Sequence, residues 1–363
     1  MRRRHYWQKV AVVFVVLVTA CVGQLTPATG FTTAAQTPEP VGPTRTPPPV
    51  IATFKVGYLR SPTYAPFFMA SEKGFFEEQG LKVELEEFRS GSQMVPLLAA
   101  GQLDAGGGEV GSALFNAIGQ GFDVRAVATL SSAPPGHSGD VVLVRKDLFD
   151  SGQVTKSADL KGRKIAINML RGIGEYMVSA AVARDGLTPN DVEFVALARS
   201  DMPAALANKA IDAAWIVYPF AAAAIEDGSA VPLFTGDQIG DNPQISVMYF
   251  GRRLLDPANR EIAVRFLVAY LKGARALYGD GARDEENIAI LSKYIGVEPR
   301  LFNKSILSYC DPDGQMNQAS IAKTQDYYVH RGYIESGKAL PLSQVVDETL
   351  LTEALKRVGP FQP

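Results

Sequence analysis

Residues 55–105 read KVGYLRSPTYAPFFMASEKGFFEEQGLKVELEEFRSGSQMVPLLAAGQLDA, and residues 164–213 repeat the same order of patterns about 109 positions later. Each copy has a short apolar strand, a helix-like run that stops at a glycine (Gly80 or Gly186), a second strand, a second helix and a closing Asp-Ala. This echo predicts two similar βαβαβ halves, and therefore two α/β lobes in one chain. A cleft between two lobes is the usual place for a small-molecule site. The alternative is a βα repeat without functional meaning.

The predicted fold class is α/β and two-lobed, with a mostly parallel sheet flanked by helices in each lobe and a ligand cleft between them. Lobe one comprises residues 53–138 and 244–363, and lobe two comprises residues 139–243. The apolar run over residues 244–250 is the predicted return strand to lobe one. Helices are expected over 66–79, 94–100, 174–185, 202–208 and 257–278, with a helical tail over 284–358 that packs on lobe one.

The N-terminus has the pattern of a targeting segment. Three arginines precede an apolar run over residues 10–20, about half the length that a membrane-spanning helix needs. A small-residue site before Cys21 resembles the lipobox of bacterial lipoproteins, which predicts a signal peptide over 1–20 and lipidation of Cys21. The Pro/Thr-rich stretch over 21–52 is then a semi-rigid spacer that holds the body off the extracytoplasmic face of the membrane. An ordinary secretory signal is the alternative, and the export route stays open.

Composition excludes several classes of function. The formal net charge is −2 with no basic stripe, which disfavours nucleic-acid binding. The chain has two cysteines, and a lipidated Cys21 leaves Cys310 without a partner, so no intrachain disulfide is expected. The three histidines are scattered, so no zinc site is expected. No other cofactor is expected, and the body of about 310 residues is long enough for two lobes in a monomer.

Four phrases resemble the extracytoplasmic solute-binding proteins of ATP-driven (ABC) importers. They are VGY at 56–58 with YAPF at 64–67, KGFFEEQGLKV at 73–83, AGQLDA at 100–105 and DLKGRKIA at 159–166. The resemblance covers nearly all of residues 54–358 and is nearest to the branch that binds alkanesulfonate, nitrate, thiamine pyrimidine and riboflavin. It implies a periplasmic-binding-protein fold, type II-like, whose lobes close on a solute and deliver it to a membrane permease.

Ligands of such α/β lobes bind where loops leave the carboxyl ends of strands. The candidate ligand-binding residues are Ser61, Thr63, Tyr64, Ser90, Gly91, Ser92 and Glu109 in lobe one, Asn168, Arg171, Gly174, Glu175, Tyr176, Trp215 and Tyr218 in lobe two, and Tyr249 in the return strand.

Each candidate also has a structural interpretation. Tyr64 could pack locally, the serines could simply cap a helix, and the three glycines before Glu109 could form a tight turn. The aromatic rings of lobe two could belong to its core. The Gly-x-Gly at residues 172–174 lacks the third glycine of a dinucleotide site.

The expected ligand follows from these residue types. Sulfonate or nitrate needs helix N-termini and an arginine, for which Arg60, Arg89 and Arg171 are available. A flat heterocycle needs stacking rings and edge partners, which the tyrosines, Trp215 and the acidic residues supply. The acidic candidates disfavour anions. We therefore expect a neutral heteroaromatic vitamin or precursor, riboflavin first and thiamine pyrimidine second.

Two other classes of function compete with transport. A relative of this fold synthesises the thiamine pyrimidine, but its cysteine-rich metal motif is absent here, so we expect no enzyme. A lipid-anchored sensor or adhesin domain is the other alternative, and the absence of a permease gene nearby would favour it.

Overall fold

The computed structural model describes residues 49–362, so the predicted signal peptide, Cys21 and most of the predicted spacer lie outside the described residues. Ten strands form two five-stranded sheets. Sheet A has the order β2 (Leu81–Glu87), β1 (Ala52–Tyr58), β3 (Ala105–Glu109), β10 (Gln244–Phe250) and β4 (Arg125–Ser132). Sheet B has the order β7 (Glu193–Ala196), β6 (Lys164–Ile167), β8 (Ala213–Val217), β5 (Asp140–Arg145) and β9 (Ala230–Thr235).

Each sheet contains one strand that runs against its neighbours, and the two sheets have the same pattern. β10 is antiparallel to β3 and β4, and β5 is antiparallel to β8 and β9. Both strands follow a crossing between the lobes, through residues 133–139 and 236–243. After each crossing the chain enters the sheet at the carboxyl ends of its parallel strands. The strand that follows therefore runs in the direction opposite to theirs. The predicted two-lobed α/β fold is confirmed, with mixed rather than wholly parallel sheets.

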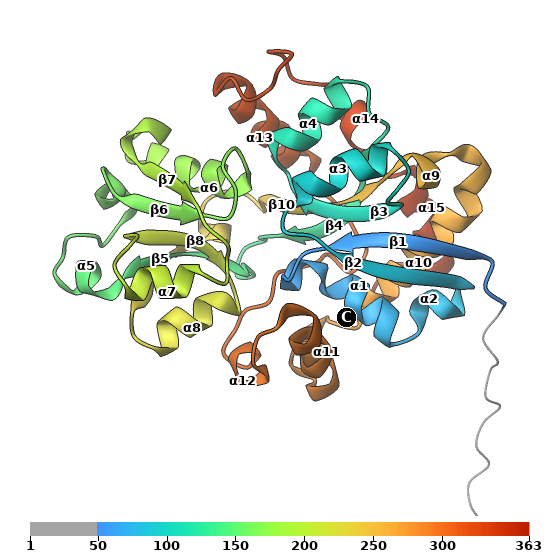
Figure 1. The fold of residues 1–363 in the computed structure, drawn as a ribbon, viewed down its shortest axis with the longest axis horizontal. Coiled ribbons are helices and arrows are strands. Elements are labelled where there is room, and N and C mark those ends of the chain that lie inside the picture. The colour runs from blue at the N-terminus through green and yellow to red at the C-terminus, as the bar shows by residue number, and fades with distance from the viewer. Residues whose placement is uncertain (1–48, 363) are drawn as a thin grey trace, which may run out of the picture. The chain divides into compact units, whose positions relative to one another are not determined.

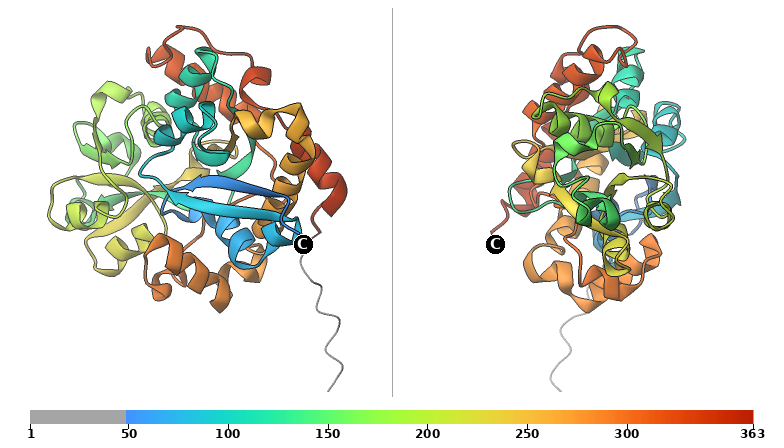
Figure 2. Two further views of the ribbon diagram at one scale, coloured as in Figure 1. Left: turned by 45° about the vertical axis from the view of Figure 1, so that its right-hand side comes forward. Right: turned by 90° about the vertical axis from the view of Figure 1, so that its left-hand side faces the viewer.

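Helices cover both faces of sheet A (Figures 1 and 2). On one face lie α3 (Gly91–Ala99), α4 (Ser112–Gly119), α13 (Gln318–His330) and α14 (Leu342–Val345). On the other face lie α1 (Ala65–Glu72), α2 (Phe75–Glu78), α10 (Arg260–Arg275) and α11 (Glu285–Ile295), with α9 (Arg252–Leu255) and α15 (Thr349–Val358) beside α10. Sheet B carries α5 (Lys146–Asp150), α6 (Ile173–Ala183), α7 (Met202–Ala207) and α8 (Phe220–Glu226).

The core of lobe one is aromatic. Phe54, Phe67, Phe76 and Phe250 each contact the ring of Phe266 on α10, with centroid distances of 5.1–6.2 Å. The Phe pairs of the sequence motif thus fix α1 and α2 against α10, because edge-to-face aromatic contacts have a preferred geometry.

Several predicted helix bounds were wrong. The run over 66–79 is two helices, because Gly74 has a φ of +73° in the left-handed region and ends the first. α3 begins at Gly91 rather than near residue 94, and Pro96 lies inside the helix. The helix expected over 257–278 is the short 3₁₀ turn Pro257–Asn259 followed by α10.

The C-terminal helices also contact lobe two. α13 packs on α4 and on α6, and α12 (Pro299–Phe302) lies near α8, where Arg300 and Lys304 form ion pairs with Glu226. The tail therefore joins the lobes as well as packing on lobe one. No helix within residues 49–362 is both long and apolar enough to cross a bilayer.

Candidate functional site

The two lobes meet through the loops that follow parallel strands. The loop after β3 contacts the loop after β6, since the backbone N–H and the hydroxyl of Ser112 both donate to the carbonyl oxygen of Arg171, at 3.3 Å and 3.1 Å. Carboxyl ends of β1, β3, β6 and β8 face this junction, where the topology rule places ligands.

A buried ion pair spans the junction. Arg199, in the loop after β7, donates from Nη2 to Oε1 of Glu109 at 2.6 Å, and the side chains are 17% and 5% exposed. The second oxygen, Oε2 of Glu109, is buried without a hydrogen-bond partner among the described residues and lies against Gly172. Glu109 therefore keeps one free acceptor at the junction between the lobes.

A second carboxyl group is close enough to the same arginine to be influenced by its charge. Asp140 is 5% exposed at the start of β5, opposite Val217 at the end of β8. Burial raises the pKa of Asp140 to about 7, the nearby Glu109 carboxylate adds to this, and the Arg199 guanidinium opposes it. One guanidinium thus pairs with Glu109 and influences a second carboxyl group electrostatically.

The three glycines before Glu109 are required by close packing in β3. A Cβ at Gly107 would lie 2.1 Å from Leu130, and one at Gly108 would lie 2.9 Å from the Tyr249 hydroxyl and 3.1 Å from Gly91. Two buried tyrosines donate hydrogen bonds to backbone carbonyl oxygens of β3. Tyr64 donates to Gly107 O and Tyr249 donates to Glu109 O, both at 2.8 Å. Burial raises the pKa of both phenols, so both stay donors.

The candidate serines and threonine lie at helix starts in lobe one. Ser61 caps the 3₁₀ turn Pro62–Tyr64 and lies 3.1 Å from the Thr63 hydroxyl. Ser90 is the N-cap residue of α3, and its hydroxyl lies 2.9 Å from that of Ser92. Within each pair the two hydroxyl groups are hydrogen-bonded to each other.

Of the residues after β6, only Asn168 keeps a free acceptor, a buried Oδ1 without a partner among the described residues. Arg171 is exposed, with its guanidinium 5.1 Å from the Tyr333 ring centroid.

Glu175 points toward the C-terminal segment. It accepts from Tyr333 at 2.7 Å, from Tyr327 at 3.2 Å and from the backbone N–H of Arg171 at 2.8 Å. The ring of Tyr176 also meets that of Tyr327, at a centroid distance of 5.3 Å. The structure therefore engages Glu175 and Tyr176 in fixing α6 to α13.

Trp215 lies in the core of lobe two. It is 2% exposed and its ring fits between Gly174 and Gly236, where added Cβ atoms would approach it to 2.9 Å and 3.2 Å. Tyr218, directly after β8, is half-buried, and burial raises its pKa.

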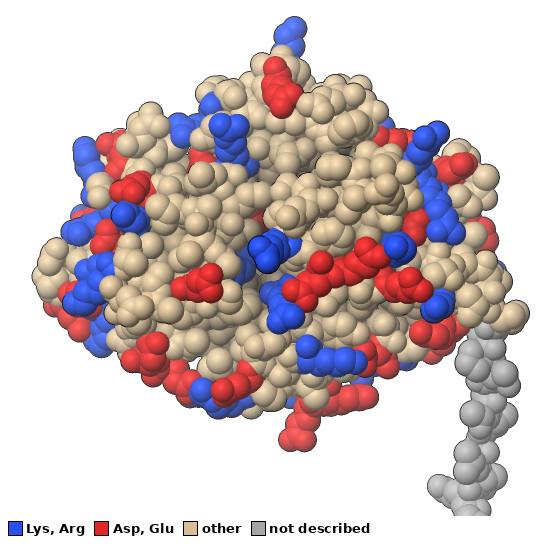
Figure 3. All heavy atoms as spheres, in the orientation of Figure 1, with Lys and Arg blue, Asp and Glu red and all other residues tan. Residues whose placement is uncertain are grey.

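Arg199 and Asp140 were missed by the sequence reasoning, which named Arg60, Arg89 and Arg171 as available arginines. Arg60 instead pairs with Glu87 at an exposed site, at 2.9 Å, and Arg89 is exposed. Charges of both signs lie over β1 and β2 (Figure 3), where Lys55 also pairs with Glu86. Such exposed pairs contribute little to stability. The internal repeat could have indicated Arg199, because it lies 109 residues after the candidate Ser90, which is the offset between the two copies.

Within residues 49–362 no group of three His, Cys, Asp or Glu side chains has the geometry to hold a metal ion. The acceptors of the junction, two carboxyl groups and an amide oxygen, suit hydrogen-bond donors on an organic molecule.

The comparison with protein families agrees with this geometry. The model of NMT1/THI5-like proteins matches residues 61–282. The chain belongs to the NMT1/THI5-like family.

Relatives of this chain differ in the activities that their names give. A protein of Brucella abortus named as a binding protein is 28% identical over 231 residues, 63% of this chain and 67% of that one. The 4-amino-5-hydroxymethyl-2-methylpyrimidine phosphate synthase of Aspergillus parasiticus is 24% identical over 298 residues, 78% and 83% of the two chains.

Solved structures share the fold. The nitrate-binding protein NrtA of Synechocystis matches with a TM-score of 0.71 at 18% identity, covering 86% of this chain and 90% of its own. The sulphonate-binding protein SsuA of Escherichia coli matches with a TM-score of 0.67 at 22% identity, covering 81% and 92%. These likenesses establish the periplasmic-binding-protein fold of the NMT1/THI5-like chain.

Proposed function

We propose that this protein is the extracytoplasmic solute-binding component of an ABC importer, and that its lobes close on a small heteroaromatic molecule that bears hydrogen-bond donors. The observation that carries the proposal is the buried pair of Glu109 and Arg199, which joins the two lobes at the carboxyl ends of their strands. A binding protein needs such contacts to form on closure and to separate on release.

The charge of the junction favours donors over anions. Glu109 and Asp140 supply two carboxyl groups against the single guanidinium of Arg199, and Asn168 adds a free carbonyl oxygen. A sulfonate or nitrate would compete with the Glu109 carboxylate for Arg199. An amino group or ring N–H would instead fill the free acceptors of Glu109 and Asn168.

The size of the ring decides the order of the ligands. Trp215 packs in the lobe-two core, so fewer rings remain for stacking on a large flavin. We therefore place the thiamine pyrimidine first and riboflavin second, which reverses the order expected from the sequence. The aminopyrimidine is small and carries an exocyclic amino donor.

Isothermal titration with 4-amino-5-hydroxymethyl-2-methylpyrimidine, riboflavin and taurine tests the proposal. We expect one-to-one binding of the pyrimidine, and a loss of roughly tenfold or more in Glu109→Gln because a charge-assisted hydrogen bond is removed. The control is Glu353→Gln, an exposed acidic residue on α15 that pairs with Arg260. Heat with taurine alone would reject the donor-bearing class, and quenched flavin fluorescence would restore riboflavin to first place.

The partners in this proposal are a membrane permease and, through a lipidated Cys21, the membrane itself. Catalysis is the competing function, since relatives carry the name of a pyrimidine synthase. Formation of 4-amino-5-hydroxymethyl-2-methylpyrimidine phosphate by the purified protein, followed by mass spectrometry, would support catalysis instead.

A further inference from the structure

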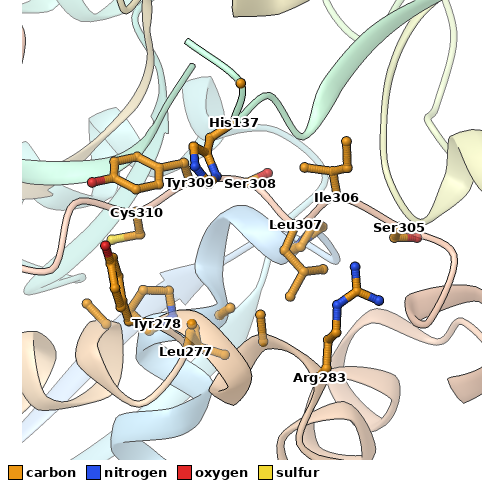
Figure 4. A pocket seen from close by; sticks show the side chains of 17 residues that line it. His137, Leu277, Tyr278, Arg283, Ser305, Ile306, Leu307, Ser308, Tyr309 and Cys310 are labelled. Carbon is orange, nitrogen blue, oxygen red and sulfur yellow. The ribbon is translucent and has the colours of Figure 1, made fainter. Parts of the chain in front are cut away.

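A cavity of about 420 Å³ lies beside the loop by which the chain first crosses from lobe one to lobe two. Its walls are the start of α1 (Ala65 and Pro66), the residues after α10 (Leu277 and Tyr278), the crossing loop at His137, and segment 305–310 (Figure 4). A volume of this size is in the range of small-molecule pockets.

Pro62, between the candidates Ser61 and Thr63, also lines this cavity, but the charged residues of the junction between the lobes do not. Segment 305–310 runs beside the edge strand β4, where the Ser132 N–H donates to Tyr309 O at 2.9 Å. Glu109, Asp140 and Arg199 are absent from the walls that the described residues form.

The lining gives the cavity an apolar body and one cationic corner. Leu277, Ile306 and Leu307 provide aliphatic surface, and Ile306 is 46% exposed despite its size. Arg283 points toward Ser305 and Leu307 in Figure 4. Its guanidinium donates to the backbone oxygen of Asn303 at 3.2 Å, and it belongs to none of the ion pairs among residues 49–362. Its charge is therefore available to an anion.

Cys310 also lines the cavity. Its thiol lies 3.3 Å from the Tyr270 hydroxyl, and burial raises its pKa to about 12, which keeps it neutral. A neutral thiol is compatible with an apolar group beside it and provides a reporter for occupancy.

We propose that this cavity is a second ligand site, for a small molecule with an apolar body and a single anionic group that pairs with Arg283. The site is lined by the crossing loop at His137 and by segment 305–310, which follows α12 in the chain. An occupant would therefore contact the segments that must bend when the lobes open.

The test uses decanoate and its neutral counterpart decanol on the full chain carrying Cys21→Ala, in which Cys310 is the one remaining cysteine. We expect both compounds to slow modification of Cys310 by methyl methanethiosulfonate, carried out at pH 9 because the thiolate is the reacting form, and followed by intact mass. Decanoate should act at roughly tenfold lower concentration than decanol, because only it pairs with Arg283. Failure of both compounds to protect Cys310 would overturn the proposal.

Two matched variants test the cationic corner. Arg283→Gln should remove the preference for decanoate, whereas Arg252→Gln, an exposed arginine on α9, should leave it unchanged. Equal effects of the two variants would contradict the role of Arg283. Ala282→Trp should fill the cavity and abolish protection, with circular dichroism to verify folding.

A final variant separates the two sites. Glu109→Gln should leave decanoate binding unchanged, since Glu109 lies in the cleft. A loss of decanoate binding in Glu109→Gln would place the probe in the cleft and overturn the second site, whatever the transported solute is.

Discussion

Arg199 of lobe two donates a hydrogen bond to Glu109 of lobe one across 2.6 Å, and both side chains are largely buried. Removing one member of a buried ion pair costs about 3–5 kcal/mol, because the remaining charge is left without compensation. In a two-lobed protein separation of the lobes relieves this cost, because it returns the remaining charge to water. The pair therefore couples the charge of the cleft to lobe closure.

Replacing Arg199 by glutamine should shift the lobes toward separation. Glu109 and Asp140 would then face each other without a cation, and we expect a larger radius of gyration by small-angle X-ray scattering in the absence of ligand. Arg60→Gln removes an exposed arginine that pairs with Glu87 and should leave the radius unchanged. Identical scattering of wild type and Arg199→Gln would show that the pair does not control closure.

Trp215→Ala should act on stability. Its ring is buried between Gly174 and Gly236, so truncation leaves a cavity that costs about 3–5 kcal/mol of unfolding free energy. The sequence alone predicts instead a loss of stacking with the ligand, about 10- to 150-fold in affinity. Urea unfolding and titration of the same variant distinguish the two: weaker binding at unchanged stability would place Trp215 in the cleft.

The repeat in the sequence was enough to predict the two lobes because strand and helix periods are local properties. Strand β10 was predicted with its observed bounds, Gln244–Phe250. The break at Gly74 was missed because the apolar pattern continues across it, and only the left-handed φ ends α1. Element bounds thus depended on backbone conformation that residue patterns do not specify.

The candidate site was less predictable, because side-chain direction depends on tertiary neighbours. Glu109 was chosen as a candidate, and it occupies the junction. Glu175 was chosen for its place after β6, but its direction is set by Tyr327 and Tyr333, about 150 residues away in sequence. Asp140 carried no motif, and only the antiparallel course of β5 brings it to the cleft.

Replacing Cys21 by serine should release the protein from membranes if the lipobox interpretation is right. Serine cannot carry the thioether-linked lipid, and without acyl chains the segment loses its stable anchor. Fractionation of cells that express each form, with detection of the body by antibody, measures the outcome. Equal membrane retention of Cys21→Ser and wild type would contradict lipidation at this residue.

Gly273→Ala should destabilise lobe one although alanine is the better helix former. The gain in helix propensity is about 1 kcal/mol. A Cβ at Gly273 would lie 2.2 Å from the backbone oxygen of Pro66, so α1 must move away from α10. We expect a net loss of about 2 kcal/mol by urea unfolding, since overpacking costs about 1–3 kcal/mol or more. Gly119→Ala, whose Cβ would meet only Leu340 at 3.8 Å, is the matched control and should be neutral or stabilising.

Asp140→Asn should change how stability depends on pH. The folded protein holds the Asp140 proton up to a pKa of about 7, whereas the unfolded chain releases it near pH 4. Between these values folding takes up a proton, so the free energy of unfolding falls as pH rises from about 4 to 7 and this contribution is then constant. Asparagine removes the effect, and the variant should exceed wild type by about 4 kcal/mol above pH 7 and match it below pH 4. Urea unfolding at pH 4, 5.5, 7 and 8 measures the difference; parallel pH profiles for the two proteins would mean that Asp140 is not protonated on folding.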